Sequence, residues 1–263
     1  MPDQLSLRLD PLLPRLPASI RPMLARSSAQ AFDSDRHLFE PRWGGERLLV
    51  FLEGGTGGPG TPLPRLVDRR GRDLALLLPE LHDVRGRLKA WSAVLDGELV
   101  VADGQGRADR PGLRARLDGL PGPAVTFLAF DLLDLNGRPL LALALERRRE
   151  LLAGVLGAAG NLLCVPAVRG DGVALFEAVV GQGLAGMMAR RLQSPYLPGV
   201  RSSLWRYVAA PAAESGDAED GKPANAEVDH ASAPAQVDEP PAEDRWRAPV
   251  LALIRRLPLD DSE

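Results

Sequence analysis

Short apolar runs dominate the pattern of hydrophobic positions between residues 39 and 208, and they predict strands. The alternating run at 46–53 (ERLLVFLE) is followed by the stretch 54–64, whose five glycines and three prolines are typical of a hairpin loop, and the run at 63–67 would return as the partner strand. Four further runs have the character of central or closing strands, at residues 92–102, 124–133, 184–191 and 204–208.

Helical periodicity appears in three segments between these strands. Residues 79–89 open with a proline suited to the first helical position and place Leu81, Val84 and Leu88 at helical spacing. Residues 146–156 and 172–180 show the same period. Strands and helices mixed in this way predict an α+β fold.

The composition divides the chain into four parts. Residues 1–21 belong to a Pro- and Leu-rich stretch without a period and predict an irregular lead-in, whereas residues 22–209 form the body. Residues 210–244 are rich in Ala, Glu, Asp and Pro, so we expect a disordered linker. The apolar segment 245–259 leaves two alternatives open, a short helix that docks on the body or on a partner, or a frayed tail.

Charge and residue usage bound the class of protein. The formal net charge of −3 divides into −8 after residue 210 and +5 before it, which permits contact with nucleic acid without requiring it. Thirty of the 32 basic residues are arginine, and the only lysines are Lys89 and Lys222. Cys164, the single cysteine, lies in an apolar run and is expected to be a buried small hydrophobe. No signal-like or membrane-spanning apolar run is present, so we expect a cytoplasmic protein without a membrane partner.

Seven stretches carry a recognisable pattern. They are PMLA at 22–25, EPRWGGER at 40–47, DRRG at 68–71, LDGELVV at 95–101, FDLL with LNG at 130–137, LAGMMAR at 184–190, and SPY with GVRSSLW at 194–205. In this order and spacing the chain resembles the adenylation domain of ATP-dependent DNA ligases, particularly the bacterial end-joining type. The resemblance implies a ligase-type adenylation domain with antiparallel sheets flanked by helices around a nucleotide cleft, followed by a disordered C-terminal tail.

The resemblance also assigns candidate nucleotide contacts. Glu40 would present its backbone to the adenine edge and Phe130 would stack on the adenine, while other side chains would approach the ribose, the phosphates or a metal: Arg42, Arg47, Arg69, Glu98 and Arg190. Plainer alternatives stay open, with Phe130 as a core residue, Glu98 and Asp131 as turn caps, and the arginines as solvated surface.

Several positions depart from the family pattern where its chemistry takes place. Arg42 stands at the position of the nucleophilic lysine, and a guanidinium stays protonated in proteins and cannot attack phosphorus. Gly44 replaces an aspartate, Ala185 a metal-binding glutamate and Arg190 a lysine, while Tyr207 and Ala209 take the last two lysine positions. The OB-fold that family ligases close over DNA would not fit in residues 209–263.

These departures favour a catalytically inactive ligase-like protein that acts as a nucleotide-, DNA- or partner-binding module in DNA repair. We expect non-covalent ATP binding or none, no divalent metal, weak salt-sensitive DNA binding through the Arg-rich segment 107–116, and a repair protein as a partner of the C-terminal segment. The alternatives are an active ligase or nucleotidyltransferase completed by a partner OB-fold protein, and a decaying gene product without a role.

Overall fold

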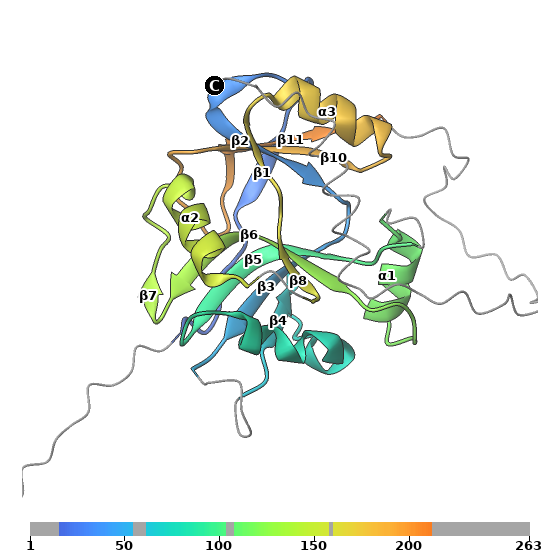
Figure 1. Cartoon of the computed structure of the whole chain (residues 1–263), viewed down its shortest axis with the longest axis vertical. Coiled ribbons are helices and arrows are strands. Elements are labelled where there is room, and N and C mark those ends of the chain that lie inside the picture. Colours follow the sequence, from blue (N-terminus) through green and yellow to red (C-terminus); the bar gives the residue numbers. More distant parts are fainter. Residues whose placement is uncertain (1–15, 55–61, 104–107, 158–159, 212–263) are drawn as a thin grey trace, which may run out of the picture.

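Two β-sheets with helices packed on them make up the fold, as the computed structural model in Figure 1 shows. The structure describes residues 16–54, 62–103, 108–157 and 160–211. The predicted linker and the apolar segment 245–259 lie outside these residues. The predicted fold class, α+β with sheets flanked by helices, is confirmed.

The first sheet has five strands in the order β1-β11-β10-β2-β9. Its strands are β1 (Leu24–Ser27), β2 (Ser34–Arg42), β9 (Val168–Gly170), β10 (Gly186–Arg191) and β11 (Arg201–Ala209). β10 runs antiparallel to both β2 and β11, whereas β1 joins the edge of β11 in parallel. Helix α3 (Gly172–Gly181) packs on β2 and β10, and its Leu175 and Val179 share an apolar cluster with Phe39 and Met187.

The second sheet has the order β4-β3-β5-β6-β7, with β8 added in parallel to β6. Its strands are β3 (Glu46–Leu52), β4 (Arg65–Asp68), β5 (Ala93–Val100), β6 (Thr126–Leu135), β7 (Arg138–Pro139) and β8 (Leu162–Cys164). Every residue of β5 is buried, because the strand has a neighbour on each edge and side chains packed over both faces. This buried centre positions the residues that β5 and β6 present toward the first sheet.

The remaining helices cover the second sheet. They are α1 (Arg110–Leu117), α2 (Leu145–Val155) and the 3₁₀ helices η1 (Ala75–Leu77) and η2 (Pro79–Arg87). Helix α2 packs on β6, and its Arg148 donates hydrogen bonds from Nε and Nη2 to the two carboxylate oxygens of Asp131, both at 2.8 Å. Both side chains are fully buried, so this pair fixes the helix on the strand.

The sequence predicted most of these elements, but the helix over residues 79–89 is a 3₁₀ helix. Leu78, Leu81 and Val84 are buried and recur every third position, which matches the three residues per turn of a 3₁₀ helix. Backbone hydrogen bonds from Leu81 to Leu78 and from Leu88 to Arg85 have the same spacing.

Several elements were missed, and one burial state was predicted wrongly. The missed elements are β1, β2, β7, β8, β9, η1 and α1. No strand was predicted at β1, because its pairing with β11 far along the chain could not be read from local pattern. Helix α1 forms within the Arg-rich segment, where Asp109 caps it by accepting the N–H of Gly112. Cys164 is exposed rather than buried, because it ends the edge strand β8 on its outward side.

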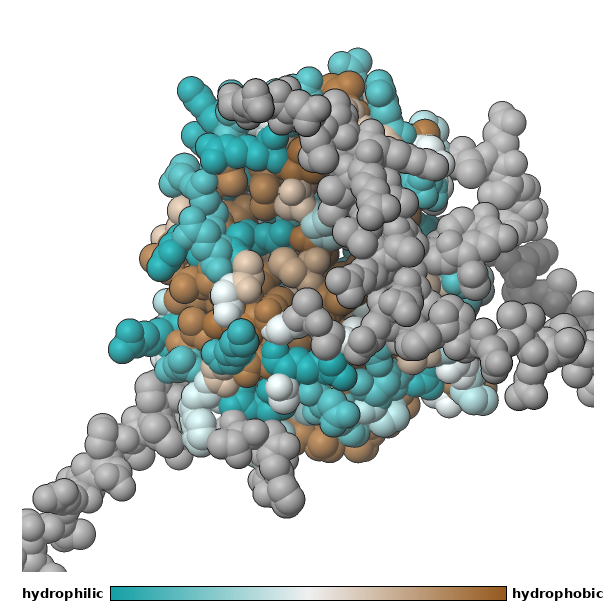
Figure 2. All heavy atoms as spheres, in the orientation of Figure 1, coloured by the Kyte–Doolittle hydropathy of each residue, from teal (hydrophilic) through white to brown (hydrophobic). Residues whose placement is uncertain are grey.

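Figure 2, in the same orientation, shows many hydrophobic residues in the left middle of this face, interrupted by a narrow hydrophilic band, with hydrophilic residues along the left edge. No helix among the described residues is long and apolar enough to cross a membrane.

Candidate functional site

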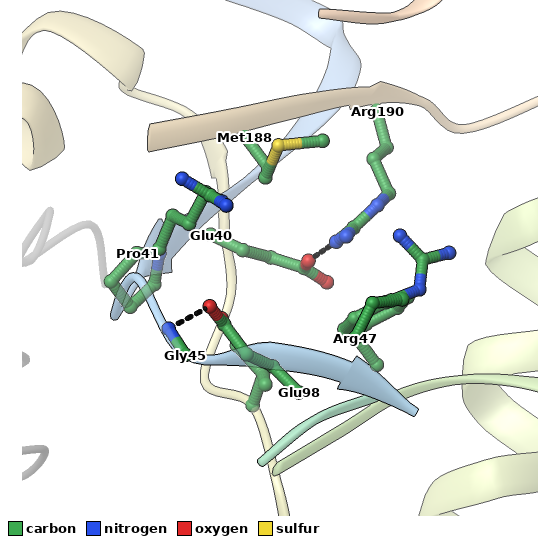
Figure 3. A pocket seen from close by; sticks show the side chains of 10 residues that line it. Glu40, Pro41, Gly45, Arg47, Glu98, Met188 and Arg190 are labelled. Carbon is green, nitrogen blue, oxygen red and sulfur yellow. Dashed lines mark hydrogen bonds and ion pairs between the residues drawn. The ribbon is translucent and has the colours of Figure 1, made fainter. Parts of the chain in front are cut away.

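A small pocket lies where the first sheet faces the second. Its lining comes from β2, the loop after it, β3, β5, β6, β10 and the residue that follows β8: Glu40, Pro41, Arg42, Gly45, Arg47, Glu98, Phe130, Val165, Met188 and Arg190. Figure 3 shows these side chains converging from the two sheets. The free volume of the pocket is about 80 Å³.

Strand register explains why these residues meet. Met188 on β10 pairs with Glu40 on β2, and Gly186 pairs with Arg42. Alternate residues of a strand point to the same side, so Met188 and Arg190 face the second sheet together with Glu40 and Arg42. Residues at the intervening positions, such as Phe39 and Ala189, belong instead to the core under α3.

The upper wall of the pocket is a cluster of two arginines and one carboxylate, of which Arg190 and Glu40 are buried and Arg149 is partly exposed. The Arg190 guanidinium forms an ion pair with Glu40 (Figure 3), and Arg149 of α2 approaches the same carboxylate with Nη1 at 3.4 Å from Oε1. The guanidinium carbon of Arg190 lies 4.0 Å from the centre of the Phe130 ring. Burial lowers the pKa of Arg190 to about 9, so the side chain is still charged at neutral pH.

A second buried cluster holds Arg47. Its Nε and Nη2 donate to the two oxygens of Asp96, both at 2.5 Å, and the Tyr196 hydroxyl donates to Asp96 Oδ2 at 2.7 Å. Burial alone would lower the pKa of Arg47, but the Asp96 carboxylate more than offsets it and raises that pKa. Arg47 therefore lines the pocket as a fixed cation, with its guanidinium carbon 4.5 Å from the centre of the Phe130 ring.

Glu98 is engaged with the backbone of the loop between β2 and β3. Its Oε1 accepts the N–H of Gly45 at 2.6 Å (Figure 3). Burial raises the pKa of Glu98, while Arg42 and the loop N–H groups act against that shift. A Cβ at Gly45 would overlap the carbonyl of Leu99 on β5, so this glycine permits a close backbone approach.

The residues at the mouth of the pocket have different partners. The guanidinium carbon of Arg42 lies 4.9 Å from the centre of the Tyr207 ring, and the Tyr207 hydroxyl donates to the carbonyl of Ala185. Gly44 has a positive φ of 85°, and a Cβ there would overlap the guanidinium of Arg110. The space that a side chain at position 44 would need is thus taken up by Arg110.

The carboxylates that line the pocket do not suit a divalent metal. Glu40 faces two arginines, and Glu98 accepts a backbone N–H. Among the described residues, no group of three or more His, Cys, Asp or Glu side chains could hold a metal ion.

The structure brings together most of the residues singled out from the sequence. Six line the pocket: Glu40, Arg42, Arg47, Glu98, Phe130 and Arg190. Arg69 does not: it is exposed in the turn after β4. Sequence reasoning missed Met188 and Arg149. Met188 could have been predicted, because it occupies an apolar position of a motif that contributes to the pocket. Arg149 could not, because nothing in the helical pattern distinguishes it from its neighbours.

Comparisons with known proteins agree with this geometry. The family model described as "ATP dependent DNA ligase domain" matches residues 22–207. The chain therefore belongs to the ATP-dependent DNA ligase domain family.

Relatives of this ligase domain include larger repair proteins. It is 35% identical over 188 residues to the multifunctional non-homologous end joining DNA repair protein LigD of Mycobacterium tuberculosis, a match that covers 71% of this chain and 23% of that protein. DNA ligase C1 of Mycolicibacterium smegmatis is 34% identical, with 69% and 54% covered. The solved structure "mycobacterial DNA ligase D complexed with ATP and MES" superimposes with a TM-score of 0.61 at 33% identity, covering 72% of this chain and 60% of that one. The chain thus spans about a quarter of the end-joining relative.

Proposed function

We propose that this ligase domain forms no lysyl adenylate and acts as a nucleic-acid-binding module in DNA repair. The observation that carries the first half is Arg42 at the nucleophile position, with its guanidinium on the Tyr207 ring. A guanidinium has no free lone pair at neutral pH, so it cannot attack the α-phosphorus of ATP. Any ATP held by this domain is therefore held without a covalent bond.

The changes around Arg42 support the same proposal. An adenylating site needs a metal ion to neutralise the phosphate oxygens, and here Gly44 and Ala185 replace two acidic side chains of the family pattern. The carboxylates that survive, Glu40 and Glu98, already have arginine or backbone partners. The departures from the family pattern thus extend over the whole mouth of the pocket.

Covalent labelling directly tests the proposal that no lysyl adenylate forms. Purified chain is incubated with α-labelled ATP and a divalent metal ion and then separated under denaturing conditions. We expect no label on the protein, while an active ligase domain treated in parallel becomes labelled. Label on this chain would instead favour the alternative, an enzyme completed by a partner OB-fold protein.

The DNA-binding half rests on an outer basic patch, formed by Arg26 on β1, Arg191 on β10 and Arg206 on β11. Arg26 is the register partner of Arg206, and all three side chains are exposed. Among the described residues none of the three makes an ion pair with a carboxylate. Like charges on neighbouring strands repel each other and destabilise a sheet. A bound polyanion would therefore offset the repulsion between these arginines.

Two aromatic rings extend the outer basic patch. The guanidinium carbon of Arg206 lies 5.2 Å from the centre of the Phe32 ring, which makes an edge contact with His37 at 5.1 Å. Burial, Arg206 and Arg191 all lower the pKa of His37, so the field at this ring is positive. Arginines beside aromatic rings suit a phosphate backbone with accessible bases. The end-joining and DNA ligase names of the relatives point to the same ligand.

Salt-dependent binding to a short DNA duplex with a single-stranded end tests the patch. We expect weak binding that falls steeply with salt, and Arg206→Gln should reduce the slope of log K against log salt by about one. The matched control is Arg114→Gln, an exposed arginine of α1 in the segment that the sequence favoured. If only the control variant lowers the slope, the DNA surface lies on α1; if binding does not depend on salt, the proposal fails.

A further inference from the structure

We propose that Arg190 occupies the place of a purine base in the pocket and keeps the pocket closed to nucleotides until its guanidinium leaves Glu40. This inference goes beyond the loss of adenylation, because it concerns whether a nucleotide enters at all. It holds equally for a pocket that does chemistry and for one that does not.

Phe130 is the one aromatic ring among the residues that line the pocket, so it offers the only face there on which a flat base can stack. Two guanidinium groups already lie over that ring, Arg190 at 4.0 Å and Arg47 at 4.5 Å from its centre. A guanidinium is itself flat and stacks on aromatic faces as a base does. A purine therefore has to displace one of the two arginines.

The size of the pocket supports this conclusion. Sites for small molecules have volumes of about 300 to 1,000 Å³, and the free volume here is about 80 Å³. Arg190 extends from β10 across the pocket to Glu40 and takes up part of this space (Figure 3).

Arg190 is the arginine that is free to leave. Arg47 is gripped by both oxygens of Asp96, which also accepts the Tyr196 hydroxyl, so its departure would strand a buried carboxylate. Glu40 has a second cation in Arg149 and stays neutralised when Arg190 moves. In addition, Arg190 Nε and Glu40 Oε1 are buried without hydrogen-bond partners, which makes the closed arrangement less stable than a fully satisfied one.

This role is the opposite of the one that the family pattern suggests for position 190. A phosphate-contacting cation would strengthen ATP binding, and its removal would weaken it. A cation that sits in place of the base weakens binding of the nucleoside part, and its removal would strengthen it. The two roles therefore predict changes of opposite sign.

Calorimetric titration of the full chain with adenosine and, separately, with inorganic tripolyphosphate distinguishes the roles. We expect Arg190→Met to bind adenosine at least about 10-fold more tightly than the wild type, because the closed state no longer reduces the apparent affinity. Tripolyphosphate binding should stay within about twofold, since stacking affects only the base. The matched control is Arg147→Met, an exposed arginine of α2 that lies neither in the pocket nor in the outer basic patch and should behave as the wild type.

Arg190→Lys covers the case in which the methionine variant does not fold. Lysine keeps a positive charge for Glu40 but lacks the flat group, so we expect a smaller gain in adenosine affinity with the melting temperature retained. Unchanged adenosine binding in the folded variants would overturn the inference, as would a selective loss of tripolyphosphate binding. Covalent labelling is a separate readout, so failure here leaves the proposed loss of adenylation unaffected.

Discussion

The motif residues on β5 and β6 and those at the mouth of the pocket differ in what holds them. Asp96 and Asp131 are fully buried, and each is bound through both oxygens by an arginine. Arg42 and Gly44, at the mouth, carry departures from the family pattern and take part in no such buried pair. Residues of an intact ligase motif can therefore stabilise the fold as well as serve the reaction.

Energetics explain the difference. Removing one partner of a buried ion pair leaves a charge without compensation and costs about 3–5 kcal/mol, which is a large part of a domain's stability. A half-exposed side chain at a pocket mouth contributes far less. On the proposed loss of adenylation, substitutions at the mouth cost little stability, whereas substitutions of Asp96 or Asp131 cost much.

The largest expected effect comes from breaking the buried pair on α2. Arg148→Met leaves Asp131 buried without its cation and should lower the free energy of unfolding by about 3–5 kcal/mol, measured by denaturant titration. Arg147→Met, next to it, removes only an exposed pair with Glu150 and should change stability by less than about 0.5 kcal/mol. Similar losses in the two variants would contradict the structural role of the buried pair.

The two adjacent glycines give the next contrast. Gly45→Ala should cost about 3 kcal/mol, because its Cβ would meet the carbonyl of Leu99 and the backbone must shift. Gly44→Ala should cost about 1 kcal/mol, since its positive φ is strained but the end of Arg110 moves easily. The order of the two losses in thermal unfolding is the test, and a reversed order would refute the assignment of Gly45 to the fold.

The smallest effect is a titration shift in the outer basic patch. Burial, Arg206 and Arg191 lower the pKa of His37 in the free protein, which favours the neutral ring. A bound polyanion would offset the two arginines and raise this pKa, so DNA binding takes up a proton and tightens as the pH falls. NMR titration of the ring protons with and without DNA measures the shift. An unchanged His37 pKa in saturated complexes would exclude the patch as the contact.

Local pattern was enough to predict the hairpin of β3 and β4, the buried strands β5 and β6, and helices α2 and α3. It could not predict β1, because the strand exists through pairing with Arg201–Tyr207 at the far end of the domain. The 3₁₀ form of η2 was missed for a different reason, since three- and four-residue spacing both fit its apolar positions.

The sequence predicted most of the residues that line the pocket, but not the contacts that these residues make with one another. Motif positions suggested Glu40, Phe130 and Arg190 as nucleotide contacts, and all three line the pocket. They gave no sign that Arg190 would lie on Phe130 or that Arg149 would join Glu40, because these contacts depend on β2, β10 and α2 meeting in space. Glu98 illustrates the same limit: its motif suggests a ligand contact, whereas its carboxylate accepts the N–H of Gly45.

The central claim is that the means to form an adenylate is lost across the whole mouth of the pocket, not at one residue. Labelling of Arg42→Lys with α-labelled ATP and a divalent metal ion tests it most directly, with an active ligase domain as positive control. The account predicts no covalent label on this variant, because the acidic side chains at positions 44 and 185 and the last-strand lysines are also absent. Labelling comparable to that of the control would contradict the claim and place the loss in Arg42 alone.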